Sequence, residues 1–186
     1  MPPKVKVTKE NIIKTATELV RQSGADAINA RAIAKVLGCS TQPIFSNFAT
    51  MDELKTAVIQ SAQELSDEYM KREIEGGLYP EYKATGMAYI RFAKEEKELF
   101  KLLYMRDRSC EGYPTSLEFG ADIEAIVRNN VGLELDRAKM FHLEMWSYVH
   151  GIATMFASGF LDLGWELVSK MCTDIYLGLK KQYEVE

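Results

Sequence analysis

Apolar residues recur along the chain at spacings of three and four, which places them on one face of an α-helix. The first such run lies between Thr8 and Gly24 and comprises Ile12, Ile13, Ala16, Leu19 and Val20. Thr8 can cap this helix, and Gly24 can end it because glycine adopts left-handed backbone conformations at little cost. Alternating runs joined by two-residue hairpin turns are not found. The sequence therefore predicts an all-α protein.

Two short helices follow, joined by a tight turn at "LGCS". Asn29 can cap the first, which Gly38 stops, and Ser40 can cap the second. Their inner contact is predicted to involve Ala34, Leu37 and Ile44, which leaves hydroxyl and amide side chains on the outer face. This arrangement is typical of a helix-turn-helix, whose second helix lies in the DNA major groove with its first residues toward the base edges.

A long helix comes next, opened by a capping box of Thr50 and Glu53 and extending to Gly76 and Gly77. Its apolar stripe is expected to be Leu54, Val58, Ser61, Leu65 and Tyr69. Further helices are predicted near residues 80–94, 96–106, 115–130, 136–158 and 163–183. A chain of 186 residues can hold one or two cores, and the breaks favour two compact units with about nine helices.

The charge is divided unevenly along the chain. Residues 1–60 carry eight Lys/Arg and five Asp/Glu, whereas residues 61–186 carry fifteen and twenty-two. DNA phosphates respond to the local potential, so a net charge of −4 does not exclude DNA binding. The basic end coincides with the helical hairpin.

Several functional classes have no support in the sequence. No apolar run is long enough to span a bilayer and no signal peptide is recognisable, so we expect a cytoplasmic protein without membrane association. Cys39, Cys110 and Cys172 lack metal or disulfide spacing, and free thiols are favoured over a redox sensor. Motifs of phosphate binding, acyl transfer and metal catalysis are missing, so we predict no enzyme, no cofactor and no metal.

The segment "INARAIAKVLGCSTQPIFSNFATMDEL" resembles the N-terminal DNA-binding domain of the TetR family of transcriptional regulators. The match spans about residues 8–58. It includes an Arg–x–Ile–Ala block, a Gly followed by Ser, and an aromatic, polar and Phe ending of the recognition helix. These are Arg31, Ile33, Ala34, Gly38, Ser40, Phe45, Asn47 and Phe48. The resemblance implies a three-helix DNA-binding domain at 1–52 and a ligand-binding and dimerisation domain at 53–186.

Gln42 can offer its amide to adenine, and the hydroxyls of Ser40 and Thr41 can meet phosphate near a helix N-terminus. The predicted DNA-binding residues are Lys9, Arg31, Ser40, Thr41, Gln42, Phe45, Asn47 and Lys55. Three positions depart from the family pattern. Phe45 replaces a Tyr, Met51 replaces a Lys, and Pro43 lies in the first turn of the recognition helix, where proline is tolerated. The alternative is a small helical subdomain that binds nothing.

The C-terminal part carries "MWSYVHG", which resembles the Trp–x–x–x–His–Gly signature of one TetR subgroup. The resemblance implies a homodimer through the last two helices, with recognition helices about 34 to 36 Å apart. A predicted effector pocket comprises Tyr89, Phe92, Met105, Phe119, Trp146 and His150. Its composition suits a small apolar or aromatic effector, and a packed core containing a hydrogen-bonded His150 is the equal alternative.

By resemblance, the expected function is a repressor that binds a palindromic operator as a homodimer and is released by a small molecule. Activation and co-repression stay open. The rival is a helical dimer that has lost operator binding and acts through a protein partner.

Overall fold

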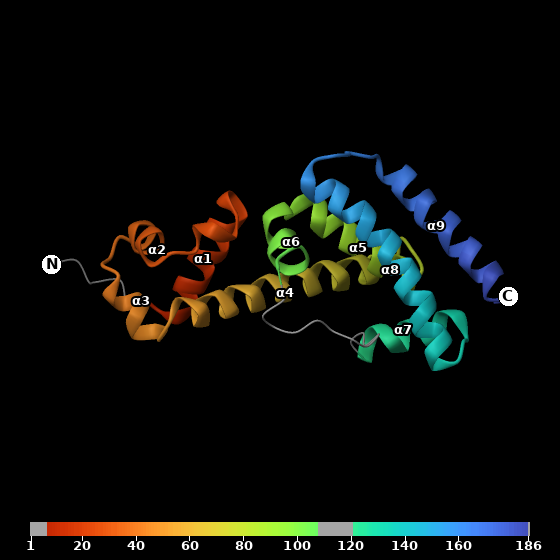
Figure 1. Ribbon diagram of the computed structural model, residues 1–186, viewed down its shortest axis with the longest axis horizontal. Coiled ribbons are helices and arrows are strands. Elements are labelled where there is room, and N and C mark those ends of the chain that lie inside the picture. The colour runs from red at the N-terminus through yellow and green to blue at the C-terminus, as the bar shows by residue number, and fades with distance from the viewer. Residues whose placement is uncertain (1–6, 108–120, 186) are drawn as a thin grey trace. The chain divides into compact units, whose positions relative to one another are not determined.

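The computed structural model describes residues 7–107 and 121–185. Over these residues the chain forms nine α-helices and one 3-10 turn, with no strand, as the sequence predicts. The helices are α1 (Lys9–Ser23), α2 (Ala30–Leu37), α3 (Gln42–Asn47), α4 (Met51–Glu75), α5 (Glu81–Glu95), α6 (Lys97–Tyr104), α7 (Ala121–Val131), α8 (Leu135–Ser158) and α9 (Trp165–Gln182). The 3-10 turn η1 (Ala25–Ala27) follows α1 (Figure 1).

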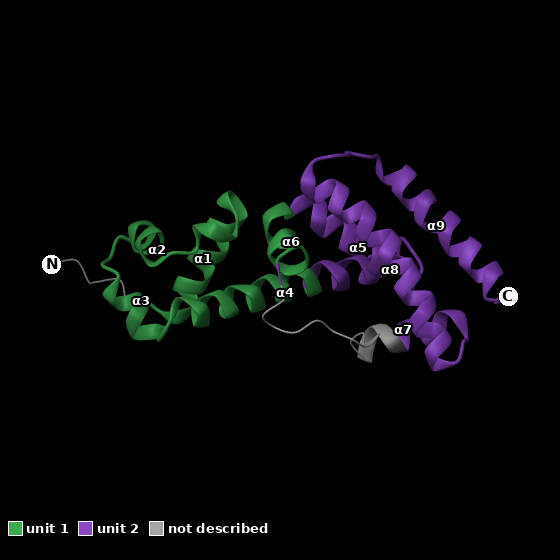
Figure 2. Ribbon diagram, viewed as in Figure 1, with its two compact units in different colours: residues 1–67, 96–106 green, residues 68–95, 107–186 purple. Residues whose placement is uncertain are grey.

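The chain divides into two compact units (Figure 2). Unit 1 comprises residues 1–67 and 96–106, and unit 2 comprises residues 68–95 and 107–186. Unit 1 therefore contains the helix-turn-helix, the first part of α4, and α6, which packs against α1. The functional boundary at residue 52 stays a prediction, because compactness does not assign function.

Unit 1 is held together by a hydrocarbon core around the hairpin. Ile12, Ala16 and Val20 of α1 are fully buried, as the spacing of four predicts. They share this core with Ile33, Ala34, Ile44 and Phe48, all at most 5% exposed. Leu37, predicted for the inner contact, is only half buried.

The first two helix starts follow the predicted capping. The hydroxyl of Thr8 accepts from the Asn11 N–H at 3.2 Å, and the Asn29 side chain accepts from the Ala32 N–H at 2.8 Å. Gly38 ends α2 in the left-handed region. Gly24 also has a positive φ of 80°, but its ψ of 177° is extended rather than left-handed helical.

The predicted cap at Ser40 is wrong. Helix α3 starts one residue later, with Thr41 at the cap position and no side-chain cap hydrogen bond. Pro43 gives the physical reason, because it lies where a capped helix offers an N–H and has none to donate. The next donor, the Ile44 N–H, already bonds to the Thr41 carbonyl at 3.1 Å.

The long helix α4 begins at the predicted box, with a shift of one residue. The Glu53 N–H donates to the Thr50 hydroxyl at 3.1 Å, but the Glu53 carboxylate returns to the Ala49 N–H at 2.8 Å. Two of the five residues of the predicted stripe are buried, and Ser61, Leu65 and Tyr69 are half buried. The buried residues of α4 are Leu54, Val58, Ala62 and Ser66, not Ser61 and Leu65. The small Ala62 and Ser66 continue the step of four, and the Ser66 hydroxyl lies 3.3 Å from that of Tyr104 on α6.

Unit 2 is organised around α5 and α8, which pack side by side. Tyr82 contacts His142 and Tyr89 contacts His150, so the two helices run in the same direction. The buried side chains of this unit include Met87, Ile90, Phe92, Phe141 and Val168, each with no exposed surface. Gly86 of α5 faces Val149 of α8, and a Cβ added there would lie 3.5 Å from the valine side chain, an ordinary van der Waals distance.

The predicted C-terminal helices agree with the structure to within a few residues, apart from α7. That helix is described from Ala121, and the predicted stretch 115–120 lies outside the described residues. Within the described ranges, no helix combines the length and apolar character needed to cross a bilayer.

Candidate nucleic-acid interface and ligand site

The exposed face of α3 is uncharged. Gln42, Phe45 and Ser46 point away from the core, and Phe45 leaves 52% of its surface exposed. Ser40 is also exposed, and Thr41 is half buried. These side chains hold their places because Ile44 and Phe48 anchor the opposite face of α3 in the core. The result is a short helix that presents amide, hydroxyl and aromatic groups to solvent.

Two polar residues of α3 bond to their own helix. The Asn47 amide donates to the Pro43 carbonyl at 2.7 Å, and the Ser46 hydroxyl donates to the Gln42 carbonyl at 2.9 Å. Asn47 is therefore less available to DNA than Gln42, whose side chain is exposed. The contact of Asn47 with DNA stays a prediction.

Basic residues surround the hairpin, and two of the predicted ones are already paired. The Lys9 ammonium lies 3.5 Å from Glu53, and the Lys55 ammonium lies 3.6 Å from Asp52. Both pairs are at the surface, where an ion pair contributes little free energy and can be exchanged for another anion. Arg31 is exposed at the start of α2. All three can reach solvent-borne phosphates without unfolding the unit.

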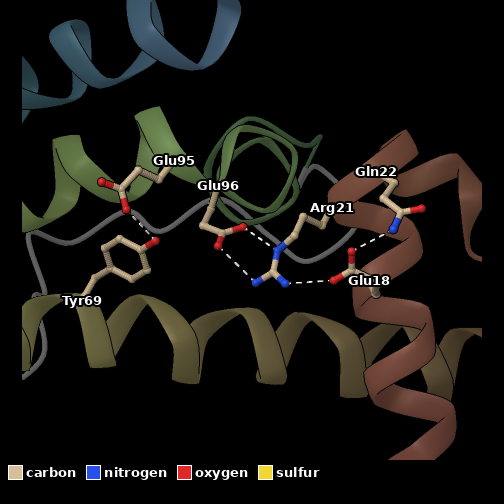
Figure 3. A network of polar contacts seen from close by, with 6 residues as sticks. All are labelled: Glu18, Arg21, Gln22, Tyr69, Glu95 and Glu96. Carbon is tan, nitrogen blue, oxygen red and sulfur yellow. Dashed lines mark hydrogen bonds and ion pairs between the residues drawn. The ribbon is translucent and has the colours of Figure 1, made fainter.

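Arg21 joins the back of the helix-turn-helix to α6 (Figure 3). Its guanidinium donates two hydrogen bonds to Glu96, at 2.7 and 3.1 Å, and a third to Glu18 at 2.9 Å. The Gln22 amide also donates to Glu18, at 2.8 Å. The hydrogen bonds that Arg21 donates to Glu96 are the main cause that raises the pKa of Arg21, whereas the hydrogen bonds that Glu18 accepts from Gln22 and Arg21 lower the pKa of Glu18. Within unit 1, α1 is thus tied to α6.

Three residues of the predicted effector pocket meet in unit 2. The Tyr89 hydroxyl lies 2.8 Å from Nδ1 of His150, and the His150 ring stacks on Trp146 with centroids 4.8 Å apart. Burial lowers the pKa of His150, which favours the neutral imidazole. All three side chains are half buried. This geometry fits both a pocket wall and a packed, hydrogen-bonded core.

The other predicted pocket residues are not gathered at this cluster. Phe92 is fully buried and its ring packs edge-on against Tyr69, 5.4 Å away. The Tyr69 hydroxyl also donates to the Glu95 carboxylate at 2.9 Å (Figure 3). Met105 belongs to unit 1 and is 46% exposed. Phe119 lies outside the described residues. The effector site stays a prediction at these positions.

Sequence reasoning missed two polar contacts inside unit 2. The Tyr82 hydroxyl lies 3.0 Å from Nδ1 of the buried His142, whose pKa burial lowers to about 4. The ammonium of Lys83 donates to two hydroxyls of α9, those of Ser169 and Thr173. A Ser and a Thr four residues apart share a helix face, which is the one signal that the sequence offered. Their shared partner, Lys83, lies 86 residues before Ser169 and 90 before Thr173, so spacing could not identify it.

Over the described residues, the chain holds a helix-turn-helix in unit 1 and a helical bundle in unit 2. Residues 82–172 match the family described as tetracyclin repressor-like, C-terminal domain. Among solved structures, the chain is similar to a TetR family member from Streptomyces coelicolor A3, with a TM-score of 0.60 and 17% identity. The match covers 89% of this chain and 96% of that one. No curated protein matches the chain in sequence.

The C-terminal domain is therefore TetR-like, and the chain has the fold of a TetR-family member. The Trp–x–x–x–His–Gly subgroup stays a prediction.

Proposed function

We propose that the protein is a TetR-like transcriptional regulator that binds a palindromic operator as a homodimer and is a repressor released by a small molecule. The observation that carries this proposal is the uncharged, exposed face of α3 on a well-buried helix-turn-helix. The TetR-like match of residues 82–172 supports it from the other part of the chain.

In this proposal, the first turns of α3 read base edges. Gln42 offers both a donor and an acceptor, the pair of groups that recognises adenine in the major groove. Phe45 lacks a hydroxyl for phosphate but has an exposed ring that suits the methyl group of thymine. Lys9, Arg31 and Lys55 supply backbone attraction, because Arg31 is exposed and the surface ion pairs of Lys9 and Lys55 can be exchanged for phosphates.

The proposed dimer uses the outer faces of α8 and α9. Met155 of α8 and Leu167 and Leu177 of α9 are 39%, 48% and 57% exposed in the single chain. Gly151 and Gly178 lie on these helices, and a Cβ added at either would meet no atom within 4 Å. Apolar side chains beside glycines suit the close approach of helices from a second copy.

The proposed effector is a small apolar or aromatic molecule near Tyr89, Trp146 and His150. Aromatic surfaces with one hydrogen-bonded polar pair are typical of small-molecule sites. Release of DNA requires that the effector bind the DNA-incompetent dimer more tightly, and the operator affinity then falls by the same coupling factor. The chain passes between the two units at 67/68, 95/96 and 106/107, which gives three covalent routes for such coupling.

The test is fluorescence anisotropy of the protein with labelled DNA, from upstream of its own gene and from a randomised pool, between roughly 50 and 200 mM salt. We expect saturable, salt-sensitive binding to a preferred site. Gln42→Ala should weaken it by about tenfold, since one bidentate base contact contributes about 1–3 kcal/mol. The matched control Gln60→Ala changes an exposed glutamine of α4, outside the hairpin, and should leave binding unchanged.

Failure to select any sequence from the randomised pool would reject operator binding and favour the dimer that acts through a protein partner. Equal losses in Gln42→Ala and Gln60→Ala would reject α3 as the reading element.

A further inference from the structure

Lys83 extends from α5 to α9 in unit 2 and ends between two hydroxyls. Its ammonium donates to Oγ of Ser169 at 2.7 Å and to Oγ1 of Thr173 at 2.8 Å. All three residues are half buried. Ser169 and Thr173 lie one turn apart on the same face of α9, so they are held at a fixed separation. The ammonium is thus fixed in place by neutral groups.

The other cations of α5 differ from Lys83 in their partners. Arg91 lies 3.0 Å from the Glu73 carboxylate, and Lys94 is paired with Asp162. Among the described residues, no carboxylate lies within 4.0 Å of the Lys83 ammonium. A partly buried charge that has lost water without gaining a counter-charge costs free energy. The arrival of an anion at Lys83 would offset this cost.

The positive charge of Lys83 also lies near an aromatic ring and a buried thiol. The Lys83 ammonium lies 4.9 Å from the centre of the Tyr79 ring. Cys172, between the two hydroxyl residues on α9, is buried, and burial raises the pKa of its thiol to about 11. Lys83 acts in the opposite direction on that thiol, because a nearby positive charge favours the thiolate and lowers the pKa.

The two hydroxyls and the ammonium at this site differ in how many of their protons already have an acceptor. The Thr173 hydroxyl donates its own proton to the Ser169 carbonyl at 3.0 Å. The Ser169 hydroxyl accepts from Lys83, and its proton has no acceptor among the described residues. An ammonium has three protons, of which two are directed to these hydroxyls. Apart from the face of the Tyr79 ring, the third N–H of Lys83 and the O–H of Ser169 have no acceptor among the described residues, so both can donate to the same oxyanion.

We infer that Lys83, with Ser169 and Thr173, forms a binding site for the carboxylate group of a small organic acid. One ammonium and one hydroxyl match the single charge and two oxygens of a carboxylate, whereas a phosphate dianion is usually held by several cations or an arginine fork. The adjacent ring of Tyr79 offers a surface for an aromatic or apolar body. The site lies between α5 and α9, apart from the Tyr89 and His150 pair between α5 and α8.

The experiment is isothermal titration of the full chain with benzoate, with benzamide as the neutral analogue and inorganic phosphate as the oxyanion without an organic body. We expect saturable binding of benzoate, and binding at least about tenfold weaker for benzamide and for phosphate. Lys83→Met should weaken benzoate binding by about tenfold or more, because it removes the charge and keeps most of the chain length.

Lys94→Met is the matched control, because it removes a cation of the same helix that already has a carboxylate partner. It should leave benzoate binding unchanged. Ser169→Ala keeps the charge and removes one donor, so it should cause a smaller loss, and it tests the site if Lys83→Met does not fold.

Equal benzoate binding in the wild type, Lys83→Met and Ser169→Ala, or no saturable binding to the wild type, would overturn the inference. Phosphate binding as tight as that of benzoate would overturn the assignment to an organic acid. The titration contains no DNA, so its outcome is independent of operator binding.

Discussion

Unit 1 and unit 2 place their polar groups differently. Around the helix-turn-helix of unit 1, the core is hydrocarbon, and polar side chains lie at helix starts or on the exposed face of α3; the buried Ser66 hydroxyl, which contacts Tyr104, lies farther along α4. In unit 2, hydroxyl and imidazole groups are buried and bonded to each other, as Tyr82 is to His142. Groups that read a polymer in water must stay exposed, whereas groups between packed helices must be satisfied internally. We therefore expect unit 1 to be destabilised most by loss of apolar core volume, and unit 2 to be sensitive also to protonation of its buried imidazole.

The largest expected effect breaks the hydrocarbon core of unit 1. Phe48 is 1% exposed, and Phe48→Ala should lower the free energy of unfolding by about 3–5 kcal/mol, because it leaves a cavity. The matched change Phe45→Ala removes an exposed ring from the same helical hairpin and should change that free energy by less than about 0.5 kcal/mol. Urea denaturation measures both. Similar losses for the two variants would contradict the described burial.

The next largest effect is expected when acid protonates His142, which is paired with Tyr82 inside unit 2. Burial lowers the pKa of His142 from 6.5 to about 4, so the unfolded chain binds its proton more readily than the folded one. Stability from this residue is present above pH 6.5 and should fall by up to about 3 kcal/mol as the pH drops to 4. His142→Gln removes the titration. Identical pH profiles of denaturation for variant and wild type would contradict the prediction.

A smaller effect is expected from removing the N-cap side chains of α2 and α3 in unit 1. Asn29→Ala removes an observed cap of α2 and should cost about 1 kcal/mol in urea denaturation. Thr41→Ala changes the cap position of α3, where no side-chain hydrogen bond is made, and should cost less than about 0.5 kcal/mol. If Thr41→Ala is the more costly of the two, the account of the α3 start is wrong.

The smallest effect concerns the Arg21 and Glu96 pair of unit 1. Arg21 is 40% and Glu96 13% exposed, so solvent screens part of the attraction. A double-mutant cycle with Arg21→Met and Glu96→Gln should give a coupling of about 0.5 kcal/mol that declines with added salt. The more exposed pair Lys71 and Glu75 should give no measurable coupling. Equal coupling in the two pairs would show that the bidentate geometry adds nothing.

Local features of the fold could be predicted from the sequence. The caps at Thr8 and Asn29 and the stop at Gly38 depend on groups within four residues, so spacing alone found them. Ser40 failed because the missing N–H of Pro43 removes the donor that a cap needs. The α4 stripe failed at Ser61 and Leu65 because the buried face continues in steps of four through the small residues Ala62 and Ser66, and Ser66 contacts Tyr104 of α6.

The candidate sites were less accessible to sequence reasoning. The outer face of α3 follows from helical periodicity, and Gln42 and Phe45 are exposed as predicted. The packing of Tyr89 on His150 joins residues 61 positions apart, and that of Lys83 on Ser169 joins residues 86 apart. Such contacts depend on how helices pack, for which one sequence offers no spacing rule.

Unit 1 includes residues 96–106 as well as the N-terminal residues, and this limits which segment can be transferred to another protein. A hybrid protein made by joining residues 1–52 to another helical bundle would omit α6, which packs on α1, and Glu96 just before it, which accepts hydrogen bonds from Arg21. Such a graft would expose the flank of α1 to water. The transferable module is therefore discontinuous, and a working chimera must carry α6 and the first half of α4 together with the hairpin.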